Sequence, residues 1–370
     1  MDEQRFAAPW RGDAAGTTST GFGDLAVRGP VAGEAFDEER SFDAPTRVHA
    51  PAQGVVRAAQ GPHEVWARVP GRTLTVTQLT PGPCRGQLLR ADLGDLGFDA
   101  GGFEGDLRMR GAMAKDAFSL VCVLERDGAV NQWGHAVEAG DILIVPPGGE
   151  LDGRFQGRTA LAVVTAPWAL IRRRAAIWDG RIDPRLWSEA GVHSPSPPAR
   201  AACRDALRRC SEMLRSLDAR APESLVGLLR QALLDGVLTA LAQAGDGGSL
   251  RQGFLNAARI IRLSEDYLAG EARPGVQIDE LCRALGISRR TLYRAFHDLL
   301  DVSPKAYLRL KNLSAARGQL LEAADRPTTV TQVALDHGFW ELGRFSGAYR
   351  TMFGETPSET LRRVQGGLRR

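Results

Sequence analysis

The sequence predicts an α+β protein. A β-rich N-terminal domain and a helical hairpin precede an all-α C-terminal domain, in which a long helix joins two helix-turn-helix units. Three observations lead to this prediction. Short apolar runs parted by Pro, Gly and Asp fill residues 65–167, two amphipathic helical patterns follow between 203 and 241, and one helical pattern occurs twice between 278 and 363. A chain of 370 residues is long enough for two folded domains.

Residues 1–60 are rich in Gly, Ala, Thr, Asp and Glu and show no sustained periodicity. We therefore expect a mostly disordered tail. The chain has no run approaching the roughly 18 apolar residues of a membrane span. Its start also lacks the charged segment and apolar core of a secretory signal. The sequence thus favours a cytoplasmic protein with no membrane partner.

The five cysteines are odd in number and scattered along the chain: Cys84, Cys122, Cys203, Cys210 and Cys282. This arrangement fits reduced thiols better than a disulfide framework or a zinc ribbon. Cys203 and Cys210 are about two helical turns apart, so a disulfide between them within one helix is geometrically implausible.

Residues 61–170 are predicted to form a β-rich domain. Six runs have β-like composition and are bounded by turn residues: 74–77, 87–92, 107–109, 118–124, 142–145 and 161–165. Short strands at this spacing are typical of a small sandwich or barrel.

Residues 171–248 are predicted to form a helical linker, which begins with an arginine run and a Pro-rich cluster at 195–198. Two apolar stripes at helical spacing follow: Cys203, Leu207, Cys210, Leu214 and Leu217 in the first, and Val226, Leu229, Leu233, Val237 and Leu241 in the second. Two interpretations remain open at this stage. The hairpin can pack on the β-rich domain, or its first stripe can form a homodimer interface.

The C-terminal part, residues 254–363, carries one helical pattern twice. Two apolar runs share a four-residue spacing and are offset by 53 residues: Leu292, Phe296 and Leu300, and then Phe345, Tyr349 and Phe353. Each run follows a shorter apolar segment that ends in glycine, at Gly286 and at Gly338. An apolar segment, a glycine that can adopt the left-handed conformation, and a second apolar segment indicate a helix-turn-helix.

Polar residues at the expected helix ends support this interpretation. Ser288 can cap the second helix of the first unit, and Thr329 with Gln332 makes a capping box at the start of the second unit. Thr356 and Glu359 make another box near the C-terminus. Two helix starts lack a good capping residue: Gln277 and Trp340.

A helix predicted from Pro304 to about Ala324 connects the two units. At about 1.5 Å per residue it spans roughly 30 Å. This length is close to one turn of DNA, about 34 Å, which separates two recognition helices that enter successive major grooves. The architecture therefore predicts binding of double-stranded DNA at two adjacent major grooves.

The charge distribution supports a nucleic-acid partner. Residues 251–370 contain 19 Lys+Arg and 13 Asp+Glu, a net charge of +6, and the totals of 47 and 44 leave 28 and 31, a net charge of −3, for residues 1–250. The basic excess thus lies in the part that would meet phosphates. In the first presumed recognition helix, five residues avoid the apolar stripe and can reach bases or phosphates: Arg289, Arg290, Tyr293, Arg294 and His297.

These residues resemble the AraC/XylS family of bacterial transcription regulators, over about a hundred residues from Ala258 to Arg363. The second unit carries the resemblance best, through Ala334, Gly338-Phe339, Phe345, Tyr349-Arg350, Phe353-Gly354 and Thr356-Pro357-Ser358. One departure is that Gly347 occupies a place where many members carry a base-contacting arginine, and Gly343 adds a second helix-weakening glycine. We therefore expect the second unit to read few bases, with three candidate DNA-binding residues: Glu341, Arg344 and Arg350.

A second, weaker resemblance lies in the β-rich domain. Residues 140–148 are similar to the second conserved strand and turn of cupins, a fold used as the sensory domain of many AraC-type regulators, and residues 78–97 are loosely similar to regulators of the ethanolamine-operon type. Metal-dependent cupins need several histidines and a carboxylate around one ion. This segment offers only His135, so we expect no metal and no cofactor.

The resemblance implies an effector-responsive transcription regulator, which we expect to be an activator that contacts RNA polymerase. The sequence does not identify the effector or its binding residues. No glycine-rich phosphate loop, nucleophile elbow or His-Glu-x-x-His motif is present, so we expect no catalytic residues and no enzyme activity. Two alternatives remain, a metal-independent cupin-type enzyme and a DNA-binding protein without a ligand.

Overall fold

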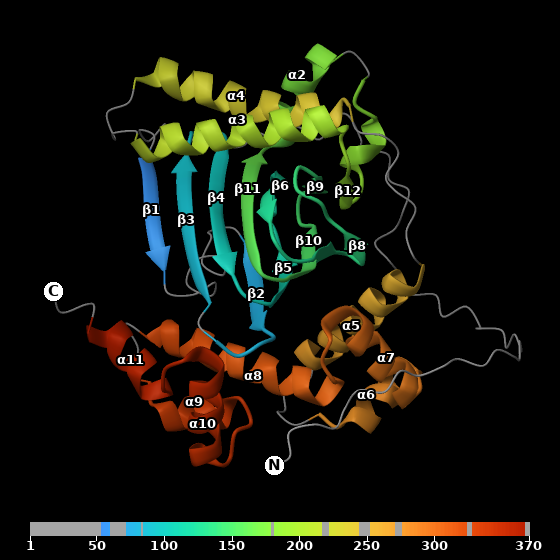
Figure 1. Cartoon of the computed structure of the whole chain (residues 1–370), viewed down its shortest axis with the longest axis vertical. Helices are drawn as coiled ribbons and strands as arrows, with labels where there is room; N and C mark the ends of the chain where they lie inside the picture. Colours follow the sequence, from blue (N-terminus) through green and yellow to red (C-terminus); the bar gives the residue numbers. More distant parts are fainter. Residues whose placement is uncertain are drawn as a thin grey trace, which may run out of the picture. The chain divides into compact units, whose positions relative to one another are not determined.

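The computed structural model describes residues 53–59, 72–82, 84–178, 181–216, 222–243, 252–270, 276–323 and 328–366. The part of the predicted tail before residue 53 lies outside these ranges. The architecture confirms the predicted α+β class, with a β-rich domain, a helical hairpin and a C-terminal helical domain (Figure 1).

The β-rich domain consists of two antiparallel sheets. The larger has the order β1-β3-β4-β11-β6-β9-β12. Its strands are β1 Gln53–Ala59, β3 Arg85–Asp92, β4 Gly97–Glu104, β11 Arg158–Ala166, β6 Phe118–Arg126, β9 Ile142–Val145 and β12 Gly191–His193. The smaller has the order β2-β5-β10-β7-β8. Its strands are β2 Thr73–Gln78, β5 Leu107–Ala112, β10 Glu150–Phe155, β7 Val130–Gln132 and β8 His135–Ala136.

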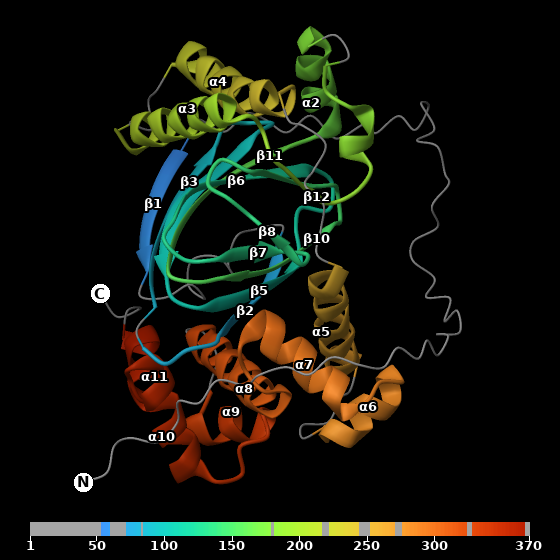
Figure 2. The same ribbon diagram turned by 45° about the vertical axis from the view of Figure 1, so that its right-hand side comes forward.

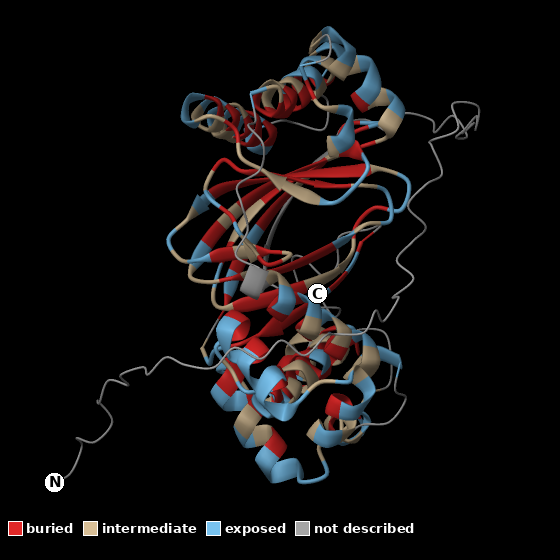
Figure 3. Ribbon diagram, turned by 90° about the vertical axis from the view of Figure 1, so that its right-hand side faces the viewer, coloured by how far each residue is buried: buried red, intermediate tan, exposed pale blue. Residues whose placement is uncertain are grey.

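Apolar side chains from both sheets form one core. Leu74 and Val76 of β2 and Met109 of β5 contribute from the smaller sheet, and Val121 and Val163 contribute from the larger. Because strand side chains alternate between faces, the polar Arg108 and Arg110 of β5 point to the opposite face of the smaller sheet. Figure 3 shows the strands of both sheets coloured largely as buried.

All six predicted strands are confirmed, and the structure contains several strands that were not predicted. Residues 53–59, assigned to the disordered tail, form β1, which pairs with β3 from Gln53↔Asp92 to Ala59↔Gly86. That assignment is wrong because the edge of β3 supplies backbone partners to a segment without strong β propensity. β4 was missed because it is rich in glycine. A Cβ at Gly101 would lie 2.1 Å from the Gln87 carbonyl oxygen, so the close strand approach requires glycine there.

The hairpin consists of α3 (Pro197–Ser216) and α4 (Glu223–Leu241), which lie across the outer face of the larger sheet (Figures 1 and 2). It follows α2 (Trp168–Ala175) and two short 3-10 helices, Ala176–Trp178 and Pro184–Trp187. Cys203, Leu207 and Leu214 are at most 2% exposed and pack with sheet residues such as Leu120. Leu217 lies outside the described residues.

This packing decides between the two interpretations of the hairpin. The first stripe is buried inside a single chain, so it is not a surface that a second copy can use, and the homodimer interpretation of this stripe is wrong. Among the described residues, α4 is the one helix long and apolar enough to cross a membrane by length and composition. Its apolar residues, Leu233 and Leu238 among them, pack in the same core as α3 and the sheet.

The C-terminal domain contains α5 Gln252–Gly270, α6 Ile278–Leu285, α7 Arg289–Leu300, α8 Pro304–Leu321, α9 Val330–Asp336, α10 Leu342–Phe353 and α11 Pro357–Gly366. It has two apolar cores, one around Leu292 and Phe296 and one around Phe345 and Tyr349. Both cores receive side chains from α8, and Leu310 of α8 borders both. The predicted pair of helix-turn-helix units joined by a long helix is therefore confirmed.

Candidate nucleic-acid interface

The first unit, α6 to α7, has the predicted turn and cap. Gly286 ends α6 in the left-handed conformation, with φ of 63°, and the Ser288 side chain accepts a hydrogen bond from the Thr291 backbone N–H. Leu292, Phe296 and Leu300 are fully buried. The opposite face of α7 is therefore held towards solvent by the burial of its apolar stripe.

All five candidate residues of α7 lie on that exposed face. Arg294 is 80% exposed and lies 3.4 Å from Asp298, and His297 is 76% exposed and lies near the same carboxylate. Arg289 forms an ion pair with Asp279 of α6, and this contact raises the pKa of the guanidinium. Such exposed pairs are weak, so they leave these side chains able to exchange a carboxylate for a phosphate or a base.

The second unit presents a different face. Gly343 and Gly347 of α10 are exposed, and a Cβ added to either would meet nothing within 4 Å. Glu341, the residue before α10, accepts a hydrogen bond of 2.9 Å from Arg344. Arg350 is exposed in the last turn. The structure thus places every predicted DNA-binding residue on the surface, and the cationic ones are denser on α7 than on α10.

Two exposed apolar side chains were missed as candidates. Trp340 is 72% exposed and Leu342 is 41% exposed, and they flank Glu341 at the start of α10. From its place before α10, Trp340 was predicted only to be a poor capping residue. A usable signal was present, since both residues fall outside the Phe345, Tyr349 and Phe353 stripe, and large apolar side chains off that stripe must lie at the surface.

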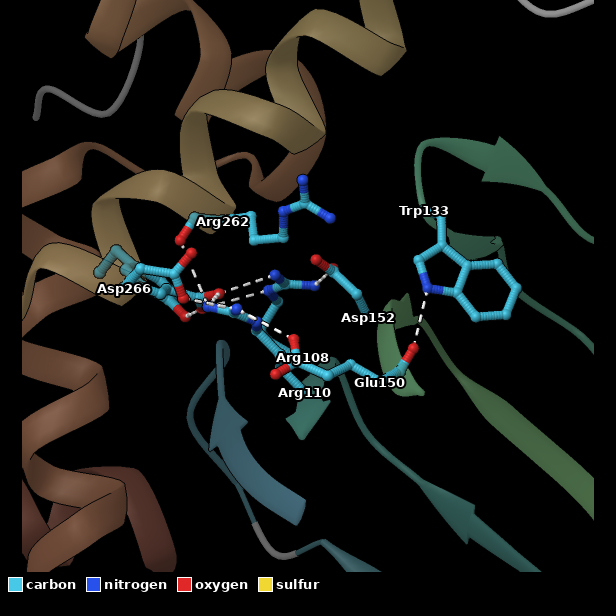
Figure 4. A network of polar contacts seen from close by, with 9 residues as sticks. Arg108, Arg110, Trp133, Glu150, Asp152, Arg262 and Asp266 are labelled. Carbon is cyan, nitrogen blue, oxygen red and sulfur yellow. Dashed lines mark hydrogen bonds and ion pairs between the residues drawn. The ribbon is translucent and has the colours of Figure 1, made fainter. Parts of the chain in front are cut away.

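The smaller sheet contacts the C-terminal domain through a buried ion network, shown in Figure 4. Arg108 of β5 donates hydrogen bonds to both carboxylate oxygens of Glu265 on α5, at 3.3 and 2.9 Å, and also pairs with Asp152 of β10. The Arg108 and Glu265 side chains are 2% and 6% exposed. Tyr307 of α8 also donates to Glu265.

Exposed pairs extend this network. Arg110 of β5 donates to Asp266 of α5 at 2.6 Å, to Glu150 of β10 at 3.1 Å and to the Arg262 carbonyl at 3.2 Å (Figure 4). The two domains are thus linked by charged groups from β5, β10 and α5. Removing one member of such a buried pair leaves an uncompensated buried charge, which strongly destabilises the folded state.

The pKa of the Glu265 carboxyl reflects this environment. Burial raises the pKa, but Arg108 and the Tyr307 hydroxyl more than offset that effect, so the pKa lies below its usual range. Burial lowers the pKa of Lys311, which lies near Glu265 and Arg110. Burial also raises the pKa of Tyr307 well above its usual value, an effect that Glu265 increases.

The described residues contain no group of three or more His, Cys, Asp or Glu side chains that could hold a metal ion. His135 lies on β8, and burial lowers its pKa. All five cysteines are buried and free. Burial raises the pKa of the Cys84 thiol to about 11, so this thiol remains protonated at neutral pH and is a poor nucleophile.

The fold and the exposed cationic helices define a DNA-binding protein with two helix-turn-helix units. A family model described as a helix-turn-helix domain matches residues 281–363. The XylDLEGF operon transcriptional activator 3 of Pseudomonas putida is 25% identical over 241 residues, which cover 62% of this chain and 67% of that protein. The XylDLEGF operon transcriptional activator 2 of the same organism is 30% identical over 125 residues, which cover 34% of this chain and 80% of that protein.

The chain therefore belongs to the AraC/XylS family of transcription regulators. Among solved structures, that of the AraC-like transcriptional activator CuxR covers 77% of this chain with all of its own, at 17% identity and a TM-score of 0.37. The family assignment rests on the sequence matches.

Proposed function

We propose that this protein is a cytoplasmic, sequence-specific transcription activator that reads two adjacent DNA half-sites and responds to a small molecule bound by its β-rich domain. The observation that carries the DNA-binding part is the pairing of two helix-turn-helix units on α8, with the exposed Arg290 and Arg294 on the face of α7 opposite its core. α8 has 18 residues and is thus about 27 Å long. That length suits recognition helices in successive major grooves, which lie about 34 Å apart.

The chemistry of α7 favours base reading in the first half-site. Arginine donates two hydrogen bonds to guanine O6 and N7, and Arg290 and Arg294 are free of strong ionic partners among the described residues. On α10, Arg344 and Arg350 fit phosphate contacts. Transcription activation, and with it a contact to RNA polymerase, is proposed because the relatives are named as operon transcriptional activators.

The interior of the β-rich domain is the proposed effector site. Ser119, Gln132 and Thr159 are 0% exposed, and their side-chain polar atoms have no hydrogen-bond partner among the described residues. Gln132 lies two residues after Val130 on the same face of β7, and Thr159 pairs across the strands with Phe103, so both face the apolar core between the sheets. Polar atoms on an apolar wall suit a small molecule with an apolar body and a few hydrogen-bonding groups.

The DNA-binding part is tested with the full-length protein and a pool of random DNA duplexes. Selection should enrich one sequence with two half-sites about one helical turn apart, and affinity should fall steeply as salt rises, because phosphate neutralisation releases counterions. No enrichment, or a salt-independent affinity, would contradict the proposal. Transcription from a template with the selected site, with RNA polymerase and the protein added, tests activation.

The effector part is tested by a small-molecule screen for increased thermal stability, since a ligand that binds only the folded state raises the melting temperature. The Gln132→Leu variant should lose the shift produced by a hit. The matched Gln87→Leu variant, which changes an exposed glutamine of β3, should keep it. A hit that stabilises both variants equally would place the effector elsewhere.

A further inference from the structure

The two recognition helices end in the same way with respect to the β-rich domain. Leu299 and Met352 occupy equivalent positions of the repeat, 53 residues apart, and each is the residue before the last in α7 or α10. The last four carbonyls of a helix have no partner within the helix. In this protein the backbone carbonyls of Leu299 and Met352 both accept hydrogen bonds from the β-rich domain.

The Leu299 carbonyl is bound by Arg154 of β10. One guanidinium nitrogen of Arg154 donates to the Leu299 oxygen at 2.9 Å. The other two nitrogens donate to Asp106 at 2.9 and 2.7 Å, so the guanidinium is fixed in place. The Arg154 and Asp106 side chains are only 10% and 13% exposed. A cation at a helix C-terminus also interacts favourably with the helix dipole.

The Met352 carbonyl is bound by the end of β2 and the turn that follows. It accepts hydrogen bonds from Gln78 Nε2 at 3.1 Å and from the Gly82 backbone N–H at 3.0 Å. Gln78 Nε2 also approaches the Thr80 and Gly82 carbonyl oxygens, at 2.9 and 2.7 Å, which orients the amide. Gln78 is 3% exposed.

The same turn reaches the rest of the C-terminal domain. The Gln78 backbone N–H donates to the Ser314 hydroxyl of α8 at 3.1 Å, and Leu79 packs in the apolar core of the first unit. The two units have separate apolar cores, which meet at Leu310 of α8. The β-rich domain therefore adds contacts to both units, beyond the connection that α8 itself makes.

We propose that the β-rich domain sets the relative position of the two recognition helices by holding the same carbonyl in each, and that Arg154 and Gln78 are positioning residues for DNA reading. The proposal rests on the proposed DNA-binding function. In this arrangement the exposed N-terminal ends of α7 and α10 remain accessible to DNA. Because β2 and β10 also line the core between the sheets, an effector bound in that core can change the distance between the two recognition helices.

Two substitutions separate this role from general stability. Gln78→Glu keeps the size of the side chain but replaces the amide donor with an acceptor that faces three carbonyl oxygens. Arg154→Met removes the donor to Leu299, and Arg154→Lys restores a cation. Gln87→Glu on β3 and Arg158→Met on β11 change exposed residues of the larger sheet and serve as matched controls.

The experiment measures the affinity of each full-length protein for duplexes in which the distance between the two selected half-sites varies one base pair at a time. Wild type and both controls should prefer one spacing. For Gln78→Glu and Arg154→Met, the affinity for non-optimal spacings should lie within about threefold of the affinity for the best spacing. The reason is that the loss of one hydrogen bond lowers the preference for one geometry by roughly a factor of three to ten. Arg154→Lys should recover part of the preference.

Several outcomes would overturn the proposal. One is a variant that folds, binds a single half-site as wild type does, and keeps the wild-type spacing preference. Another is a uniform loss of affinity at all spacings, which indicates a structural role only. If Gln78→Glu does not unfold cooperatively, the Arg154 variants decide, because Arg154, at 10% exposed, is less deeply buried than Gln78, at 3%. A wild type that binds no DNA would instead refute the proposed function.

Discussion

The two helix-turn-helix units share a core and differ in their DNA-facing side chains. Phe296 and Tyr349, at equivalent positions, are both 0% exposed. On the exposed face, Arg290 and Arg294 of the first unit correspond to Gly343 and Gly347 of the second. Burial constrains the core of each unit in the same way, whereas solvent-exposed positions can differ without cost to the fold. The exposed face therefore carries the difference in how the two units read DNA.

The units also differ in what anchors them. The first unit is bound to the β-rich domain through the buried Glu265 of α5. The second has an internal pair, Arg317 of α8 with Glu355, at 3.0 Å and with side chains 7% and 21% exposed. Arg317 also stacks over the Phe353 ring, 4.7 Å from its centroid. Loss of the Arg108–Glu265 pair should therefore weaken the contact between the first unit and the β-rich domain, and it should leave the Arg317–Glu355 pair of the second unit intact.

The largest expected effects test whether the apolar cores of the two units contribute equally to the free energy of unfolding. Phe296→Ala and Phe345→Ala should each lower the free energy of unfolding by about 3 to 5 kcal/mol, because each removes a fully buried ring. Chemical denaturation followed by circular dichroism measures both. A difference of more than about 2 kcal/mol between them would contradict the view that the two cores are equivalent.

A second prediction concerns the anchor of the first unit. Glu265→Gln should cost about 3 kcal/mol, the lower end of the range for a broken buried pair, because Asp152 still pairs with Arg108. The folded-state pKa of Glu265 lies below its ordinary value of 4.5. Its stabilisation is therefore present above the unfolded pKa and lost as pH falls through the folded pKa. Denaturation between neutral and acid pH should show a smaller acid loss in Glu265→Gln than in wild type, and equal losses would refute this.

The third prediction separates base reading from phosphate contact. Arg294→Ala should cost about 1 to 3 kcal/mol of binding free energy and relax sequence preference at one or two base pairs. Arg344→Ala should weaken binding to all sequences alike. It should also reduce the slope of log affinity against log salt concentration by the contribution of about one phosphate contact. Selection of DNA sites by each variant compares them. Equal sequence information in both wild-type half-sites would show that the asymmetry is wrong.

A fourth prediction concerns a variant in which α10 carries an arginine at the position equivalent to Arg294 of α7. Gly347→Arg has open space, since nothing lies within 4 Å of an added Cβ, and it should stabilise α10 by about 0.5 to 1 kcal/mol through helix propensity. It should also tighten DNA binding and increase the salt dependence. Gly227→Arg, at an open position of α4, is the control, because it should stabilise its helix without any change in DNA binding.

The smallest expected effect concerns the apolar side chains at the start of α10. Trp340→Ala should leave the free energy of unfolding unchanged, because the side chain is 72% exposed. If it contacts a thymine methyl group, affinity should fall by about 1 kcal/mol or less, and only for sites with an A·T pair in the second half-site. A loss that is independent of sequence would assign Trp340 to the DNA backbone.

The sequence by itself determined the C-terminal domain, because helices depend on local signals. The spacing of Leu292, Phe296 and Leu300 and the Ser288 cap are confirmed. The box of Thr356 and Glu359 is complete, with bonds of 2.7 and 3.3 Å. The box at Thr329 is half-formed, because Thr329 accepts from the Gln332 backbone while the Gln332 side chain binds Asp336. The eight candidate DNA contacts remain predictions, although each lies at the surface.

Only the tertiary structure decided what the local pattern leaves open. The glycine-rich β4 and the strand β1 exist because neighbouring strands supply their hydrogen bonds. The hairpin stripe fits a sheet or a second copy equally well, and the sheet is the partner present in the chain. The contacts of Arg108 with Glu265 and of Gln78 with Met352 join residues 157 and 274 positions apart. Periodicity describes one element at a time, so it cannot state which distant element meets it.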